Sequence, residues 1–186
     1  MLGSASGNHH LKKTTWLVLI IAALVLVVDQ TVKYLVAASL PLGGTWSPLS
    51  GPYPFFQIVH TSNTGVAFGL FKDLGFVFIL VPLAISGAII FYARRLREDQ
   101  KLMAVALGLM LGGALGNVID RIRLGYVIDY FDVGISTLRN ASNFADWSIV
   151  LGVILLGLVT LLDERKRKKL AAAQVGGASS SHDGPA

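Results

Sequence analysis

Four long apolar segments dominate this chain, at residues 16–38, 74–93, 102–119 and 144–162. The hydrocarbon core of a bilayer is about 30 Å thick, and an α-helix needs about 20 residues to cross it. Each segment is close to that length, so the sequence predicts an all-α membrane bundle of four transmembrane helices. The composition agrees, because 53% of the residues are hydrophobic, only 15% are charged, and the mean hydropathy is +0.63.

The basic residues predict the orientation of the bundle, since Lys and Arg concentrate on the cytoplasmic side of membrane proteins. Two lysines precede the first segment, and an RKRKK run at residues 165–169 follows the fourth. Between the second and third segments lie Arg94, Arg95, Arg97 and Lys101. Residues 34–71 contain neither Lys nor Arg. Both termini are therefore expected in the cytoplasm, and the net charge of +5 requires no nucleic-acid partner.

The chain is expected to have one structured domain between two tails. Residues 1–15 are predicted to be a cytoplasmic segment, and residues 16–162 the transmembrane domain. Residues 163–186 are predicted to be a basic and then disordered cytoplasmic tail, because Ala, Gly and Ser dominate from Leu170 onward. The apolar start resembles a signal peptide, but Asp29 and Lys33 interrupt it, so it is expected to remain as an uncleaved anchor.

The first segment carries two charged residues at a depth where charges are costly. At 1.5 Å per residue, Asp29 lies about 20 Å into the first helix, in the outer half of the bilayer. Lys33 follows at i+4, where the two side chains can pair. Ionisable residues inside a membrane are candidates for function.

Polar residues of the other segments are expected at the same outer level. The third segment leads outward to Asn117, Asp120 and Arg121. The fourth begins on the outer side beside Asp146, and the SNTGVAFG motif at residues 62–69 precedes the second. The sequence therefore predicts that these polar residues form one site at the outer membrane edge.

Each of these residues also has a structural explanation when it is taken alone. Asp146 is of the residue type that favours helix N-caps. Asp29 and Lys33 suit a structural ion pair, and the polar residues that end the third segment suit an internal network. Asp132 is expected to be a solvated loop carboxylate. The repeated Gly108, Gly112 and Gly116 are expected to allow close helix packing.

The inventory of reactive side chains limits the possible chemistry. Cysteine is absent, and His60 is remote from the other histidines, so no metal site or other cofactor is expected. Two neighbouring carboxylates can divide the work of hydrolysis, one ionised and one protonated. The ionised member takes a proton from water while the protonated member polarises a carbonyl. Composition and spacing do not select the pair among Asp29, Asp120, Asp129, Asp132 and Asp146.

The same residues are also compatible with two other kinds of protein. A small proton or ion carrier would use the buried carboxylates as relays, although short helices without broken-helix repeats favour it less. A Ser–Lys protease would use Lys33 as its base, but no serine is evidently placed beside that lysine.

Four motifs of this chain closely resemble those of lipoprotein signal peptidase, also called signal peptidase II. The motifs are DQTVK at residues 29–33, NTGVAFG at 63–69, GNVIDRIRLGYVIDYF at 116–131 and NFADWSIVLG at 143–152. Their order and spacing follow the family over residues 16–162. Two departures are mild, since tyrosine follows the aspartate of VIDYF and valine follows the glycine of NTGV.

The resemblance implies an aspartic endopeptidase of the bacterial inner membrane. Members of the family remove signal peptides from prolipoproteins, cutting just before the cysteine that carries a diacylglyceryl group. The implied catalytic pair is Asp129 and Asp146. Membrane lipids surround such an enzyme, globomycin is its expected inhibitor, and nothing in the sequence demands more than a monomer.

The same correspondence implies roles for the other polar residues. Site ordering or substrate binding is assigned to Asn63, Asn117, Asp120, Arg121 and Asn143, whereas Asp29 and Lys33 are assigned a structural or orienting role. The family also has a small extracytoplasmic β-rich cradle and a mobile amphipathic helix over the site. The β-branched and aromatic residues at 126–135 fit a strand of that cradle. Residues 40–61 are expected to lie against the outer membrane surface.

Overall fold

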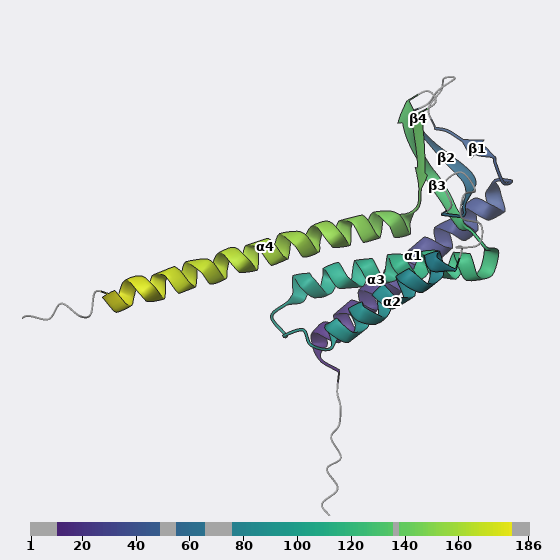
Figure 1. Cartoon of the computed structure of the whole chain (residues 1–186). Coiled ribbons are helices and arrows are strands. Elements are labelled where there is room, and N and C mark those ends of the chain that lie inside the picture. The colour runs from purple at the N-terminus through teal and green to yellow at the C-terminus, as the bar shows by residue number, and fades with distance from the viewer. Residues whose placement is uncertain (1–10, 49–54, 66–75, 136–137, 180–186) are drawn as a thin grey trace, which may run out of the picture.

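The computed structural model of the protein describes residues 11–48, 55–65, 76–135 and 138–179. Helices form most of this part of the chain, and a small sheet stands at one end of them (Figure 1). The helices are α1 (Lys13–Ser39), α2 (Val77–Ala93), α3 (Lys101–Leu124) and α4 (Phe144–Ser179). The expected helices with a small β-structure are therefore confirmed in outline.

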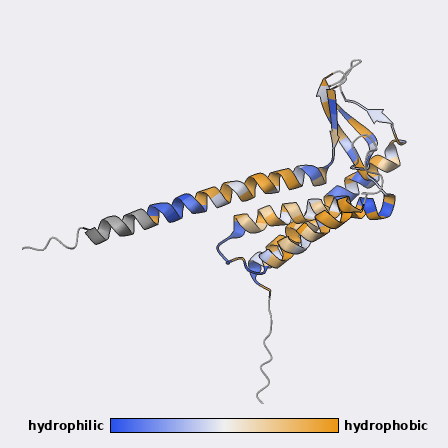
Figure 2. Ribbon diagram, in the orientation of Figure 1, coloured by the Kyte–Doolittle hydropathy of each residue, from blue (hydrophilic) through white to orange (hydrophobic). Residues whose placement is uncertain are grey.

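Three of the helices are long and apolar enough to cross a membrane: α1, α3, and α4 over Phe144–Leu170. Helix α2 is shorter, with 17 residues, and the start of the predicted second segment lies outside the described residues. The helices consist largely of apolar residues (Figure 2). Many of these residues face outward, and Leu24, Phe91 and Ile154 are all more than half exposed. An apolar exterior of this extent suits lipid and not water.

Helix α3 lies at the centre and contacts the other three helices. Its glycines allow the close approach of α1, because a Cβ atom on Gly112 would lie 2.6 Å from the carbonyl oxygen of Ala22. A Cβ atom on Gly116 would lie 2.5 Å from Oδ2 of Asp29, so this glycine leaves the room that the carboxylate occupies. The predicted packing role of the glycines is confirmed.

The sheet is antiparallel and has the strand order β1-β2-β3-β4. Its strands are β1 (Thr45–Trp46), β2 (Phe56–Asn63), β3 (Val127–Ile135) and β4 (Leu138–Ser142). Gly125, in the left-handed conformation at φ 82°, ends α3 and turns the chain into β3. Strand β4 leads directly into α4. The predicted strand at 126–135 is therefore confirmed, and the β3–β4 pair lies between α3 and α4 in the chain.

Helix α4 continues well beyond its apolar part. The disorder predicted from Leu170 differs from the structure, in which the helix runs on to Ser179. The segment is rich in Lys, Arg, Leu and Ala, which favour helix, and Glu164 pairs with Lys168 at 2.7 Å across one turn. The amphipathic helix that the family resemblance implies has no counterpart within the four described ranges.

Candidate active site

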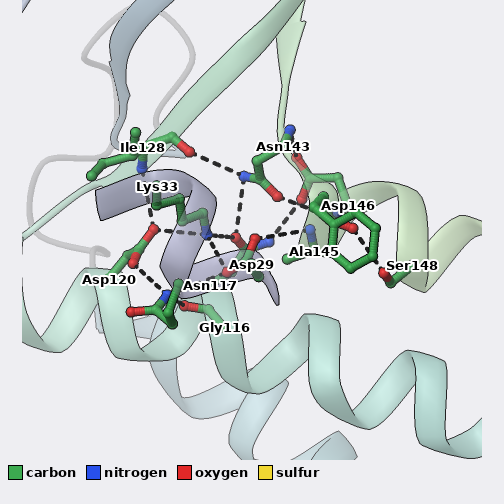
Figure 3. A network of polar contacts seen from close by, with 12 residues as sticks. Asp29, Lys33, Gly116, Asn117, Asp120, Ile128, Asn143, Ala145, Asp146 and Ser148 are labelled. Carbon is green, nitrogen blue, oxygen red and sulfur yellow. Dashed lines mark hydrogen bonds and ion pairs between the residues drawn. The ribbon is translucent and has the colours of Figure 1, made fainter. Parts of the chain in front are cut away.

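The predicted polar residues meet where α1, α3, the sheet and the start of α4 join (Figure 3). They are linked through hydrogen bonds and ion pairs that run from one element to the next. The linked side chains are Asp29, Lys33, Asn63, Asn117, Asp120, Asp129, Asn143 and Asp146. The predicted convergence of these residues is therefore confirmed.

The start of α4 is capped by a reciprocal pair of side chains. Asn143 Oδ1 accepts a hydrogen bond from the Asp146 N–H at 2.9 Å. Asp146 Oδ2 accepts one from the Asn143 N–H at 3.4 Å. This is a capping box, in which the first and fourth residues satisfy each other's free backbone donors. Asn143 is thus the N-cap, and Asp146 lies in the first turn and not at the N-cap position.

Asp129 on β3 is buried and held by two amides. Its Oδ1 accepts from Asn143 Nδ2 at 2.7 Å, and its Oδ2 accepts from Asn63 Nδ2 at 2.9 Å. Burial raises the pKa of Asp129 above the usual range of a carboxyl group, the two amides oppose this rise, and the nearby charge of Asp146 adds to it. The Asp129 carboxyl group therefore keeps its proton to a higher pH than a carboxyl group that is exposed to water.

Asp146 has a different environment. Its Oδ1 accepts a hydrogen bond from Asn117 Nδ2 at 2.7 Å, and the side chain is only partly buried. Its place in the first turn of α4 puts its charge at the positive end of the helix dipole. Asn143 Nδ2 also approaches Asn117 Oδ1 at 3.2 Å, so the two carboxylates are joined through neighbouring amides.

Lys33 contacts three polar residues of the cluster and is almost completely buried. Its ammonium group lies 2.9 Å from Asp29 Oδ2 and 2.8 Å from Asp120 Oδ2. It also donates to Asn117 Oδ1 at 3.0 Å. The expected ion pair of Asp29 with Lys33 is confirmed. The Lys33 ammonium group therefore orients the Asn117 side chain, whose amide nitrogen donates to Asp146.

Asp29 and Asp120 tie the helices to the site. Asp29 Oδ1 accepts the Ala145 N–H at 3.0 Å, so α1 holds the first turn of α4. Asp120 Oδ2 accepts the Ile128 N–H at 3.2 Å, so α3 holds β3 beside the buried aspartate. Both carboxylates are engaged in these structural bonds.

Two residues of the network were not assigned a role from the sequence. Gln30 Nε2 donates to Asp120 Oδ1 at 2.9 Å. The sequence feature that could have indicated this role is that Gln30 is a polar residue next to Asp29 in an apolar segment. The Tyr130 hydroxyl accepts the Phe144 N–H at 3.1 Å, and burial raises the pKa of Tyr130. The sequence does not indicate that a tyrosine in a strand accepts a hydrogen bond from the backbone of a helix start.

Arg121 lies at the edge of the cluster, within reach of electrostatic interaction with Asp146 and Asp129. Its guanidinium stands over the ring of Phe78 at 5.7 Å, and Nη1 approaches the carbonyl oxygen of Asn117 at 3.5 Å. Arg121 and Asn117 border an apolar cavity of about 390 Å³ between α2, α3 and α4. Its other lining residues are Pro82, Ile85, Met110, Ala114, Ile149 and Val153. An apolar space therefore reaches the site from the side of the helices.

A second cavity of about 390 Å³ reaches the site from the side of the sheet. Its lining is more polar and includes Asp146 itself. The other lining residues are Asn63, Asn140, Ala141, Ser142, Trp147 and Val150. Asp146 and Asn117, which are hydrogen-bonded to each other, thus lie between an apolar space and a polar one.

Asp132 does not fit its predicted role as a solvated loop carboxylate. It lies in β3 and is buried, with Arg139 Nε at 2.7 Å and Gln57 Nε2 at 2.6 Å from its Oδ2. The prediction is wrong because the neighbouring strands place these two polar residues beside it, which the sequence does not reveal. The described residues contain no group of three or more His, Asp or Glu side chains that could hold a metal ion.

Comparison with known proteins gives one consistent answer. The family model for signal peptidase (SPase) II matches residues 21–162. The chain is 42% identical over 154 residues to the lipoprotein signal peptidase of Geobacter metallireducens, covering 81% of this chain and 93% of that protein. It is 39% identical over 150 residues to the lipoprotein signal peptidase of Bacillus subtilis, covering 80% of this chain and 96% of that protein.

A solved structure supports the same relationship. It is described as a bacterial membrane enzyme structure by the in meso method at 2.3 Å resolution, and it superposes with a TM-score of 0.70 at 31% identity. The match covers 86% of this chain and 95% of the other. The fold, the polar site and the matched sequence agree, and the chain belongs to the signal peptidase II family of membrane peptidases.

Proposed function

We propose that this protein is an intramembrane aspartic endopeptidase that cuts diacylglyceryl-modified prolipoproteins just before the lipidated cysteine. Peptidase activity follows from membership of the family. The aspartic mechanism rests on one observation, the double role of Asn143. Its amide holds the Asp129 carboxyl while its carbonyl oxygen holds the backbone of Asp146. One residue thereby contacts both proposed catalytic carboxyl groups, that of Asp129 through its side-chain amide and that of Asp146 through its backbone N–H.

In this mechanism, Asp129 carries the proton at rest and Asp146 is ionised. Asp146 takes a proton from a water molecule, whose oxygen attacks the carbonyl carbon of the scissile peptide bond. Asp129 gives its proton to the carbonyl oxygen. When the tetrahedral intermediate collapses, the C–N bond breaks and Asp146 gives the proton it took from water to the leaving amine. A hydroxyl group of the intermediate returns its proton to Asp129 as the C=O bond forms again, which restores both carboxyl groups to their starting states. The raised pKa of the buried Asp129 supports this division of roles.

The remaining polar residues are proposed to order the site or to bind substrate. Asn63, Asn117 and Asn143 hold the two carboxylates, and Asp120 fixes β3. Arg121 borders the apolar cavity, where it is suited to the substrate main chain. Asp29 and Lys33 have an orienting role, because they contact Ala145 and Asn117 and neither of the proposed catalytic carboxyl groups.

The apolar cavity between α2, α3 and α4 is suited to the membrane-embedded part of the substrate. Its walls are aliphatic apart from Asn117 and Arg121, so acyl chains or a signal-peptide helix can enter without loss of apolar contacts. The scissile bond would then lie at the carboxyl groups of Asp129 and Asp146. This arrangement explains why a polar site is built at the end of an apolar bundle.

We also propose that the chain crosses the bacterial inner membrane four times as a monomer, with both termini in the cytoplasm. In this topology, α2 completes the fourth crossing and the sheet lies outside. The basic residues at the start of α1, between α2 and α3, and within the polar part of α4 support this orientation.

Cleavage of a diacylglyceryl-modified prolipoprotein, followed by gel shift, tests the proposal. The wild type is expected to cleave and globomycin to block it, whereas Asp129→Asn and Asp146→Asn lose at least about a thousandfold in activity. Asp132→Asn, on the same strand as Asp129, is the matched control and is expected to retain activity.

Either Asn variant of the proposed pair retaining activity would move the chemistry to another carboxylate, and Asp120 would be the first to examine. A folded wild type that leaves the substrate intact would overturn the proposed substrate and return the carrier hypothesis to consideration.

A further inference from the structure

Strand β4 forms one edge of the sheet. The order β1-β2-β3-β4 leaves β4 with β3 as its strand neighbour, and within the described ranges no strand pairs with its other side. An edge strand presents unpaired N–H and C=O groups to its surroundings and is a template for pairing with another chain. The opposite edge, β1, has only two residues, whereas β4 has five. β4 is therefore the longer template.

The polar cavity connects this edge to the proposed catalytic centre. Its lining includes Asp146 and the residues Asn140, Ala141 and Ser142 of β4, together with Asn63 of β2. Asn143 joins β4 to α4 and holds Asp129 at 2.7 Å. A chain whose scissile bond lay at the two aspartates would therefore find the β4 edge next to it.

The direction of β4 suits the part of the substrate that follows the cut. β4 extends away from the helices, beginning at its far end and returning to the start of α4 (Figure 1). The apolar cavity, on the side of the helices, is suited to the part of the substrate that lies in the membrane. The part that leaves the membrane must run outward from the scissile bond, and β4 runs along that path.

Recognition by main-chain hydrogen bonds also suits the chemistry of the substrate. The residues after a lipidated cysteine belong to the mature proteins and are not expected to share a sequence. Pairing with a strand edge uses the main chain, which every sequence has, and leaves the side chains free to vary. The side chains of β4 are small or polar at Asn140, Ala141 and Ser142, and they do not close the cavity.

We infer that the substrate segment immediately after the lipidated cysteine binds to the free edge of β4 as an added strand of the sheet. The inference rests on the proposed function, because it takes the substrate and the scissile position from it. It assigns to the sheet a binding role toward the mature part of the substrate.

A scan of substrate peptides tests the inference. Lipidated peptides are prepared with an N-methyl group at successive residues after the cysteine, one residue at a time, and kcat/KM is measured with the full-length enzyme. In a strand, alternate residues direct their N–H groups toward the same neighbour. Methylation is therefore expected to lower kcat/KM about threefold to tenfold at every second residue, the effect of one lost hydrogen bond, and to change it little at the residues between.

A flat profile, or one that falls smoothly with distance from the cysteine, would overturn strand addition. The unmethylated peptide separates this failure from failure of the proposed function. Cleavage of that peptide with a flat profile rejects only the added strand, whereas an uncleaved peptide rejects the proposed substrate.

Photo-crosslinking from the two edges of the sheet gives a second test. A benzoylphenylalanine replaces exposed Asn140 on β4 in one variant and exposed Thr45 on β1 in the matched control. Both are combined with Asp129→Asn to prevent cleavage. The segment after the cysteine is expected to crosslink to position 140 and not to position 45. Equal crosslinking, or crosslinking from β1 alone, would contradict the inference.

Discussion

Asn143 and Asp146 satisfy each other's backbone N–H groups at the start of α4, at 2.9 and 3.4 Å. The same Asn143 side chain uses its amide group to hold Asp129 at 2.7 Å. One residue thus caps a helix and positions a carboxyl group on a neighbouring strand. The two roles use different atoms, Oδ1 for the cap and Nδ2 for the carboxyl, so substitution can separate them.

Asn143→Ser is expected to keep the helix cap and lose the amide donor. Serine is a good N-cap, so the free energy of unfolding should stay close to that of the wild type. The lost hydrogen bond to a carboxyl group should lower kcat/KM about tenfold to a hundredfold. Asn143→Ala loses both roles and should in addition lower the free energy of unfolding by about 1 kcal/mol. Tryptophan-fluorescence melting and the cleavage assay measure the two effects. Equal activity of the serine variant and the wild type would contradict the positioning role.

Asn63→Ala is expected to change the pH dependence of cleavage. The Asn63 amide stabilises the charged form of Asp129, so it lowers the pKa of that carboxyl, and its removal lets the pKa rise further. In the proposed mechanism Asp129 must hold a proton, so activity is lost as pH rises through its pKa. The alkaline limb of the kcat profile should therefore move to higher pH.

Ser62→Ala is the control for this shift, because Ser62 is the exposed neighbour of Asn63 on the same strand. Its alkaline limb should coincide with that of the wild type. An acid limb that moves to higher pH in Asn63→Ala, with an unmoved alkaline limb, would show that Asp129 acts in its ionised form and that the two aspartates have the opposite roles.

Gly112→Ala is expected to destabilise the helix bundle. The added methyl group would lie 2.6 Å from the Ala22 carbonyl oxygen, and the main chain of α1 cannot move away without losing its contacts with α3. Overpacking of this kind costs about 1–3 kcal/mol. Gly157→Ala, in α4, meets no atom within 4 Å and should be neutral or slightly stabilising. Thermal melting of the two variants in one detergent makes the comparison. Equal melting temperatures would contradict the close contact of α1 with α3.

Lys33→Met is expected to be strongly destabilising. Methionine has a similar length, but the change leaves Asp29 and Asp120 buried without their shared positive charge. Removing one partner from a buried ion pair costs about 3–5 kcal/mol of the free energy of unfolding. Adding Asp29→Asn should recover part of that loss, because one unpaired charge is removed. Unfolding titrations of the single and double variants measure the difference, and a single variant as stable as the wild type would contradict the structural role of the ion cluster.

Lys168→Met is the control for the loss of a lysine in general. Lys168 pairs with Glu164 across one turn of α4, and both side chains are more than half exposed. Exposed pairs of this kind contribute little, so its unfolding curve should match that of the wild type.

Hydrophobic pattern predicted the helices and most of the polar cluster, whereas the family resemblance added Asp129 and Asn143 to that cluster. Apolar segments of the length of a bilayer mark the helices, and charged residues such as Asp29 and Lys33 are conspicuous inside them. The i,i+4 spacing of those two residues also predicted their ion pair, which the structure contains. Local spacing and hydropathy were enough for these features.

The sequence did not predict contacts that depend on how distant segments meet. The register of the sheet decides which strand residues lie beside Asp132. Its partners Gln57 and Arg139 could therefore not be predicted from the sequence. The bond from the Ala145 N–H to Asp29 depends on where α4 begins relative to α1. The choice of Asp129 and Asp146 as the pair came from the family resemblance, since five aspartates were compatible with the spacing alone.

The two proposed catalytic carboxyl groups belong to different parts of the fold, Asp129 to the sheet and Asp146 to a helix of the bundle. Folding of either part by itself supplies one half of the pair. In the proposed mechanism, peptidase activity therefore requires the sheet to be docked on the helices, with Asn143 between the two carboxyl groups. A chain in which the sheet and the helices have not yet packed together holds the two carboxyl groups apart, so completing the fold also completes the proposed site.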